Sequence, residues 1–171
     1  MKNSLYAALL FLGLAVLTAC GGETAPEEKF TKEYDLAPFG VMLKVRGPEG
    51  LNINKVTGGI LPHEITMQGE EFQVYLYGQG AETEDVKTLK EEQKEETKAS
   101  KKGFEIISED DNGYVFSMQY EGDTTKFYNF EYLYIQGDQQ FRMTSSTVTQ
   151  YSQEAIMDMY KAIEQRPSAE K

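Results

Sequence analysis

The fold of this chain is decided by residues 104–148, which read FEIISEDDNGYVFSMQYEGDTTKFYNFEYLYIQGDQQFRMTSSTV. The segment contains four runs of strand-forming residues, at 104–108, 114–120, 127–135 and 141–148. Short runs rich in β-branched and aromatic residues, bounded by Gly, Asn and Asp, predict consecutive antiparallel strands. The run at 127–135 is apolar on both faces, so we expect it to lie in the interior of the sheet.

Further strands are predicted before this segment. Apolar residues alternate from position 39 to 45, which indicates a half-buried strand that ends at the turn residues 47–50. Ile53 and Val56 suggest a short second strand, and residues 72–77 read as a clear third strand.

Two helices complete the pattern. The first is predicted from Thr83 to Lys102, with Thr83 as its N-cap and Gly103 after its end. Its apolar stripe is thin, so we expect a largely solvated helix that is supported by charge pairs three and four residues apart. Ser152 caps the second helix, whose expected buried stripe consists of Ile156, Met159, Tyr160 and Ile163.

This order of elements predicts the α+β class, with one antiparallel sheet of about six to seven strands covered by two helices. We assign residues 33–171 to this single globular domain. The opening residues 39–43 with Pro48 beyond them, the aromatic meander at 114–144 and the closing helix together resemble the PsbP-like fold. An extrinsic photosystem protein and bacterial DcrB-type lipoproteins share that fold, so the resemblance implies an α/β/α sandwich. A cystatin-like sheet is the alternative.

The N-terminus has the form of an export signal. Lys2 precedes an apolar run from Leu5 to Ala19, which is shorter than the ~20 residues needed to span a bilayer as a helix. The run ends in Leu17-Thr18-Ala19-Cys20, which resembles the bacterial lipobox, and Cys20 is the only cysteine of the chain. We therefore expect a lipoprotein signal peptide at 1–19 and a flexible tether at 20–32.

The lipobox resemblance implies that acyl chains on Cys20 hold the protein on a membrane of the cell envelope. Two or more chains make such attachment effectively permanent, whereas one chain binds only marginally. Gly21, rather than Asp, follows Cys20, which in the enteric sorting pattern favours the outer membrane.

Composition argues against several functions. The formal net charge is −11, and loss of Lys2 with the signal makes it more negative by one charge. Nucleic-acid affinity depends on Lys and Arg, so we expect no nucleic-acid partner. The chain has a single His, and lipidation consumes its single thiol. We therefore expect no two-His or Cys-based metal site, no cofactor and no catalytic activity.

Three local motifs have ordinary explanations. His63 lies between Pro62 and Glu64, and we interpret it as a structural histidine in a loop. Residues 78–80 read Gly-Gln-Gly but lack the third glycine of a dinucleotide fingerprint, which indicates a turn. Residues 108–113 resemble a calcium loop superficially, but their spacing favours a hairpin turn in which Asn112-Gly113 adopts positive φ.

One aromatic row is the candidate interaction face. Its members alternate along the run at 127–135 and are Tyr128, Phe130, Tyr132 and Tyr134. If the first helix covers them poorly, they form an exposed patch for a partner protein or ligand. The leading hypothesis is a membrane-tethered, non-catalytic binding or assembly module with an envelope protein partner, which the PsbP-like resemblance supports, since PsbP-like proteins mostly act as extrinsic subunits or have no assigned activity. The alternative is a small-ligand-binding lipoprotein with a pocket between sheet and helix, and an exposed patch or a concave cavity would distinguish the two.

Overall fold

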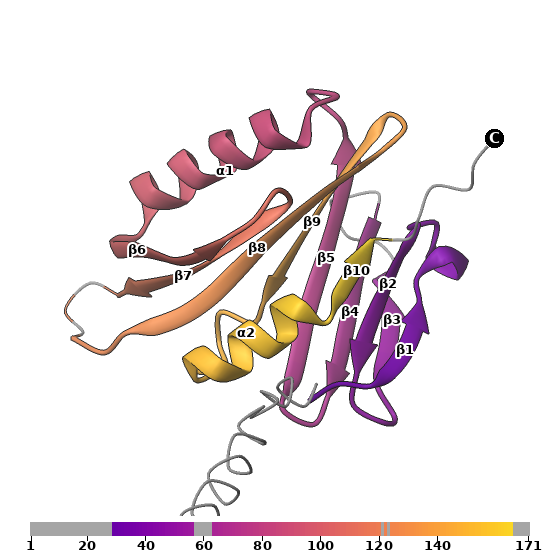
Figure 1. Ribbon diagram of the computed structural model, residues 1–171, viewed down its shortest axis with the longest axis horizontal. Coiled ribbons are helices and arrows are strands. Elements are labelled where there is room, and N and C mark those ends of the chain that lie inside the picture. Colours follow the sequence, from indigo (N-terminus) through magenta and orange to yellow (C-terminus); the bar gives the residue numbers. More distant parts are fainter. Residues whose placement is uncertain (1–28, 57–62, 121, 123, 166–171) are drawn as a thin grey trace, which may run out of the picture.

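The computed structural model describes residues 29–56, 63–120, 122 and 124–165 (Figure 1). Its first elements in chain order are β1 (Lys32–Asp35), the 3-10 helix η1 (Ala37–Phe39), β2 (Leu43–Gly47), β3 (Asn52–Lys55), β4 (His63–Gly69) and β5 (Phe72–Gly80). They are followed by α1 (Val86–Ser100), β6 (Lys102–Glu109), β7 (Gly113–Gln119), β8 (Phe127–Gln136), β9 (Gln139–Ser145), α2 (Gln153–Lys161) and β10 (Ile163–Gln165).

Seven of the strands form one antiparallel sheet in the order β3-β4-β5-β9-β8-β7-β6. The predicted α+β class is confirmed, since two α-helices accompany this sheet. β8 pairs with β7 on one side and β9 on the other, so its predicted interior position is also confirmed. A second sheet of three strands, in the order β1-β2-β10, was not expected from the sequence.

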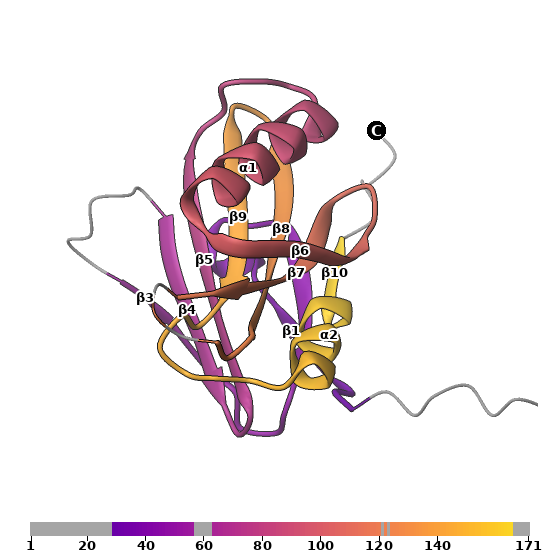
Figure 2. The same cartoon turned by 90° about the vertical axis from the view of Figure 1, so that its left-hand side faces the viewer.

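The two helices lie on opposite faces of the large sheet (Figures 1 and 2). Side chains alternate between the faces along each strand, and residues paired across strands share a face. The face toward α2, called here the α2 face, carries Val74, Leu76, Phe130, Tyr132, Phe141 and Met143. The opposite face, called the α1 face, carries Tyr75, Tyr77, Glu131, Leu133, Arg142 and Thr144.

The main hydrophobic core fills the space between the α2 face and its cover. Leu43 and Val45 of β2, together with Ile156 and Met159 of α2, are fully buried there. Full burial of one such side chain contributes about 1.5–3 kcal/mol. Because β10 pairs with β2, the last described strand lies beside one of the first and helps to cover this core.

The predicted strand at 39–45 begins later than expected. Pro38 and Phe39 belong to the 3-10 helix η1, and Gly40 ends it with φ of +88°. Val41 is nevertheless buried, and β2 starts at Leu43. The expected alternation of buried residues is therefore correct, but the proline and the left-handed glycine turn the chain before the strand begins.

The helix boundaries also differ from the expected ones. Asp85, not Thr83, caps α1, and its carboxylate accepts hydrogen bonds from the backbone N–H groups of Lys87 and Thr88. The Ser152 cap of α2 is confirmed by its hydrogen bond from the Ala155 N–H group. Ile163 lies beyond the end of α2 and belongs to β10.

Folded structure begins before residue 33, the start that we assigned to the domain. Phe30 is only 6% exposed and packs edge-to-face on Phe72, with 5.1 Å between ring centroids. Lys29 pairs with Glu71 at 2.9 Å. The signal at 1–19, Cys20 and the tether up to residue 28 lie outside the described residues. Within the described part, no helix is long and apolar enough to cross a membrane.

Candidate functional site: a polar cleft between α1 and the sheet

A cleft separates α1 from the α1 face of the sheet. It consists of two adjoining cavities of about 430 Å³ and about 370 Å³. The two cavities adjoin, and the cleft is the name used here for both together, because four of the described residues line each of them: Tyr77, Gln93, Glu96 and Arg142. Each volume lies within the range of about 300–1,000 Å³ that is typical of small-molecule sites.

The floor of the cleft contains an ion pair between neighbouring strands. Arg142 of β9 donates two hydrogen bonds to the carboxylate of Glu131 of β8, through Nε and Nη2, each at 2.6 Å. The Glu131 side chain is 3% exposed, whereas that of Arg142 is 42% exposed and opens into the cleft. Burial raises the pKa of Glu131, and the contact with Arg142 opposes that effect.

A buried amide fixes the floor next to this pair. The Asn129 Oδ1 atom accepts hydrogen bonds from the hydroxyls of Thr144 and Ser145 and from the Ser145 backbone N–H group. These bonds join β8 to β9 in addition to the strand pairing. A polar group with satisfied hydrogen bonds can remain buried at little cost, so the polar floor is compatible with a stable sheet.

An aromatic surface continues the floor along β5. The rings of Tyr75 and Tyr77 are stacked, with 6.3 Å between centroids and 11° between planes. Both residues are half-buried, and desolvation raises the pKa of the Tyr77 phenol. Tyr77 lines both cavities, whereas Tyr75 is not among their lining residues and supports Tyr77 from the side.

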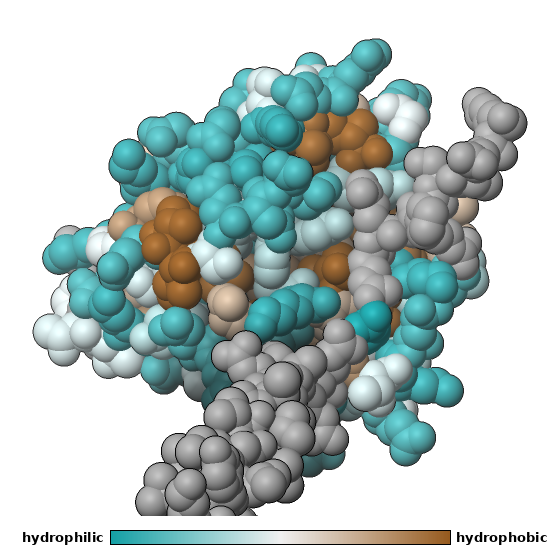
Figure 3. Space-filling view, viewed as in Figure 1, coloured by the Kyte–Doolittle hydropathy of each residue, from teal (hydrophilic) through white to brown (hydrophobic). Residues whose placement is uncertain are grey.

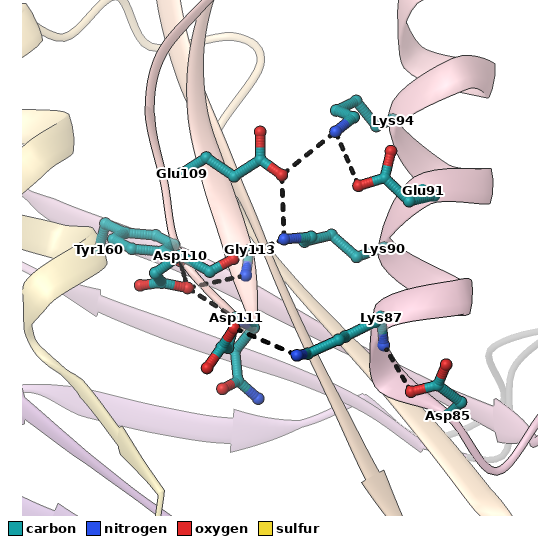
Figure 4. Close-up of polar contacts among 11 residues, drawn as sticks. Asp85, Lys87, Lys90, Glu91, Lys94, Glu109, Asp110, Asp111, Gly113 and Tyr160 are labelled. Carbon is teal, nitrogen blue, oxygen red and sulfur yellow. Dashed lines mark hydrogen bonds and ion pairs between the residues drawn. The ribbon is translucent and has the colours of Figure 1, made fainter.

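Helix α1 is the opposite wall, and polar contacts hold it to the hairpin between β6 and β7 (Figure 4). Lys90 is 8% exposed and donates to the backbone carbonyl of Asp110 at 2.6 Å and to Glu109 at 2.9 Å. Lys94 also contacts Glu109, at 3.1 Å. These hydrogen bonds, first that from Lys90, lower the pKa of Glu109.

The same hairpin is tied to α2. Tyr160 of α2 donates to the Asp110 side chain at 2.7 Å, and Asp110 also accepts from the N–H groups of Asn112 and Gly113 (Figure 4). Burial, reinforced by the contact with Asp110, raises the pKa of Tyr160. The turn at 110–113 therefore fixes both helices relative to the sheet.

A further contact holds α1 near its C-terminal end. The hydroxyls of Thr97 and Tyr114 lie 3.1 Å apart, and both residues are buried. Burial raises the pKa of Tyr114. The outer surface of α1 is hydrophilic (Figure 3), in agreement with its thin apolar stripe. Polar contacts, more than apolar packing, thus position this wall of the cleft.

The predicted aromatic row does not form an exposed patch. Tyr128, Phe130, Tyr132 and Tyr134 do share one face, but that face is covered by α2 and the small sheet instead of by α1. Phe130 is fully buried and Tyr132 is 6% exposed, and both pack against Tyr160. Tyr128 and Tyr134 are half-buried at the margin of the core. These residues therefore serve mainly as core.

The structure also shows the positions of His63, of the glycines at 78 and 80, and of the turn at 110–113. His63 is the first residue of β4, a strand that we did not predict, and its ring packs on Phe141 with centroids 5.7 Å apart. Gly78 and Gly80 continue strand β5 instead of forming a turn. The predicted hairpin at 110–113 is confirmed, but neither Asn112 nor Gly113 has positive φ, because the Asp110 carboxylate organises the turn.

Sequence reasoning missed the ion pair in the cleft floor. Glu131 interrupts an apolar strand, which is the one signal that could have singled it out. Nothing in the sequence pairs it with Arg142, because that contact depends on the register between β8 and β9.

Comparisons with known proteins give no relative for this chain: no family model, no curated protein and no solved structure matches it.

Proposed function

We propose that this chain is a non-catalytic envelope lipoprotein whose domain binds a small molecule in the cleft between α1 and the sheet. The two adjoining cavities of the cleft support this proposal, since polar side chains and the aromatic residue Tyr77 line them together. Because Phe130 and Tyr132 are buried, they do not form the exposed aromatic patch that would have favoured a protein partner, and a concave cavity is the feature that we expected of a ligand-binding domain.

The tethering part of the proposal rests on Leu17-Thr18-Ala19-Cys20. Lipid on Cys20 would hold the protein on the outer membrane and leave the domain to bind its ligand near that surface.

Native mass spectrometry of the full chain, gently extracted from its own membranes and equilibrated with a small-molecule extract of the same cells, tests ligand binding. We expect the acylated chain to carry one additional small molecule. Gln93→Trp should remove that molecule, because Gln93 lines both cavities and an indole would fill the space. Glu92→Trp is the matched control on the exposed side of the same helix.

Two results would contradict the proposal. A chain that retains no small molecule, or one that retains it equally in Gln93→Trp, would exclude the cleft as the binding site. Cys20→Ser tests the tether separately: we expect this variant to move from the membrane fraction to the soluble fraction. A variant that stays in the membrane fraction would disprove lipid attachment through Cys20.

A further inference from the structure

The charges that line the cleft are balanced, although the chain as a whole is strongly acidic. Among the described residues, two carboxylates, Glu96 and Glu131, and two cations, Lys101 and Arg142, line the cleft. The whole chain has a net charge of −11. Glu131 already neutralises Arg142 through two hydrogen bonds, so a ligand anion would gain little from the guanidinium. A balanced lining therefore favours an uncharged ligand.

The remaining polar groups are mainly amides and hydroxyls that can both donate and accept hydrogen bonds. On the sheet they include Gln79 and Gln140, and on α1 they include Gln93. The hydroxyls of Thr144 and Ser100 also line the cleft, but they already donate to Asn129 Oδ1 and to the Thr97 carbonyl, so they offer a ligand acceptor sites. Arg142 has five N–H donors, of which Glu131 engages two. Within the described part of the chain, no acceptor binds the other three N–H groups of Arg142. Such a lining is complementary to a ligand with many hydroxyl groups, each of which is both donor and acceptor.

An aromatic ring lies beside these polar groups. Tyr77 is stacked on Tyr75, which restricts the orientation of its ring at the place where the two cavities adjoin. The face of an aromatic ring carries partial negative charge, and it attracts the weakly positive C–H groups of an apolar surface. A sugar ring presents such C–H groups on its face and hydroxyls around its edge.

We propose that the ligand of the cleft is a neutral oligosaccharide, with one sugar ring on Tyr77 and its hydroxyls bound by the glutamines and Arg142. The inference rests on the proposed function and deepens it by naming the ligand class. The two adjoining cavities suit a chain of sugars better than a single one, because Tyr77 and Arg142 lie where they meet.

The test is an NMR titration of the isotope-labelled full chain with neutral oligosaccharides. The probes are maltohexaose, cellohexaose, xylohexaose, mannohexaose and N-acetylchitohexaose, with glutamate, citrate, adenosine and spermidine as comparison ligands. We expect at least one neutral sugar to bind and to shift the amide signals of α1, β5 and β9.

Substitutions at Tyr77 test the aromatic contact. Tyr77→Ala should raise the Kd for the sugar about tenfold, whereas Tyr77→Phe keeps the ring and should preserve the affinity. If Tyr77→Ala does not fold, Gln93→Trp and its control Glu92→Trp replace it as the pair that blocks or spares the cleft.

Each outcome decides the ligand class. Sugar binding that shifts only signals outside the cleft, or that survives Gln93→Trp, would overturn the inference. Binding of a comparison ligand alone in the cleft would overturn the sugar class and leave the proposed function standing. Absence of binding by all five sugars would also overturn the sugar class, and the native mass spectra would then decide the proposed function independently.

Discussion

At the scale of single residues, the pair of Glu131 and Arg142 dominates the cleft. Glu131 is a carboxylate buried in the floor of the cleft. Its burial would greatly destabilise the fold without the two hydrogen bonds from Arg142. Its raised pKa has a defined consequence for stability. A carboxyl whose pKa is higher in the folded than in the unfolded chain stabilises the fold at a pH below its pKa in the unfolded chain. This contribution is lost as the pH rises through its pKa in the folded protein.

Arg142→Met should therefore destabilise the protein in a pH-dependent way. Removal of the guanidinium leaves an uncompensated buried carboxylate, and we expect a loss of about 3 kcal/mol in the free energy of unfolding at pH 8. The loss should shrink as the pH falls toward 5, because protonation neutralises Glu131. Urea unfolding at both pH values measures this difference, and the double variant Glu131→Gln/Arg142→Met should recover part of the stability. An equal loss at both pH values would contradict the argument.

The fold requires a glycine at position 113, because neighbouring backbone atoms leave no space for a side chain there. A Cβ added there would overlap the backbone carbonyl oxygen of Glu131 and lie 3.0 Å from the Cα atom of Tyr132. Backbone atoms within a paired strand cannot move aside easily. Gly80 has no atom within 4 Å of the same added carbon.

Gly113→Ala should therefore cost about 3 kcal/mol or more in the free energy of unfolding, as overpacking in a rigid site does. Gly80→Ala is the matched control and should change it by less than about 0.5 kcal/mol. Thermal or urea unfolding compares the two. Similar stability of both variants would show that the β7–β8 pair can separate to admit a methyl group.

At the scale of elements, α1 is a wall that is held mainly by polar contacts. Lys90 and Lys94 on α1 meet Glu109 on β6, and Thr97 meets Tyr114 on β7. The lysines hold the pKa of Glu109 below its usual value. The contacts of the two lysines with Glu109 therefore stabilise the fold at a pH above the pKa that Glu109 has in the unfolded chain. This contribution is lost as the pH falls through the pKa of Glu109 in the folded protein.

Lys90→Met should loosen α1 and retain most of the aliphatic packing of the side chain. Loss of the hydrogen bonds from a buried ammonium should cost about 1–3 kcal/mol at pH 7 and accelerate hydrogen exchange of α1 amides. The difference from the unmodified protein should narrow as the pH falls through the lowered pKa of Glu109, because the protonated carboxyl no longer attracts the ammonium. Lys98→Met is the control, because Lys98 is 62% exposed and its contact with Glu95 is 3.7 Å. Equal exchange rates in both variants would disprove the anchoring function of Lys90.

At the scale of the whole molecule, the two ends of the described chain meet on one core. Phe30 packs against Phe72, and β10 pairs with β2 through Ile163 and Val45. The folded domain therefore includes residues that the sequence assigned to the tether. Truncation at residue 33 would remove part of the core.

Phe30→Ala tests this domain boundary. Loss of a buried ring in a core should cost about 3–5 kcal/mol in the free energy of unfolding. Lys29→Ala keeps the Phe30 ring and removes an exposed ion pair with Glu71 and an ammonium that lies 5.7 Å from the centroid of that ring, so it should cost less than about 1 kcal/mol. Urea unfolding of the two variants measures the contrast. A loss below about 1 kcal/mol for Phe30→Ala would place the boundary after Phe30, as the sequence suggested.

The sequence by itself determined most of the elements and the α+β class. Strand positions from β5 to β9 follow from local alternation and turn residues, and the Ser152 cap follows from hydrogen-bonding chemistry within one turn of helix. These features depend on neighbours in sequence, so a single chain displays them. β4 was missed because only Ile65 and Met67 mark its buried side.

The tertiary structure alone decided which helix covers which face. The row from Tyr128 to Tyr134 had the pattern of a shared face, but its burial depends on α2 and on the sheet formed by β1, β2 and β10. The cleft likewise depends on the register that brings Glu131 beside Arg142 and on the hairpin that holds α1. These contacts join residues far apart in the chain, and local physical chemistry does not specify such long-range pairings.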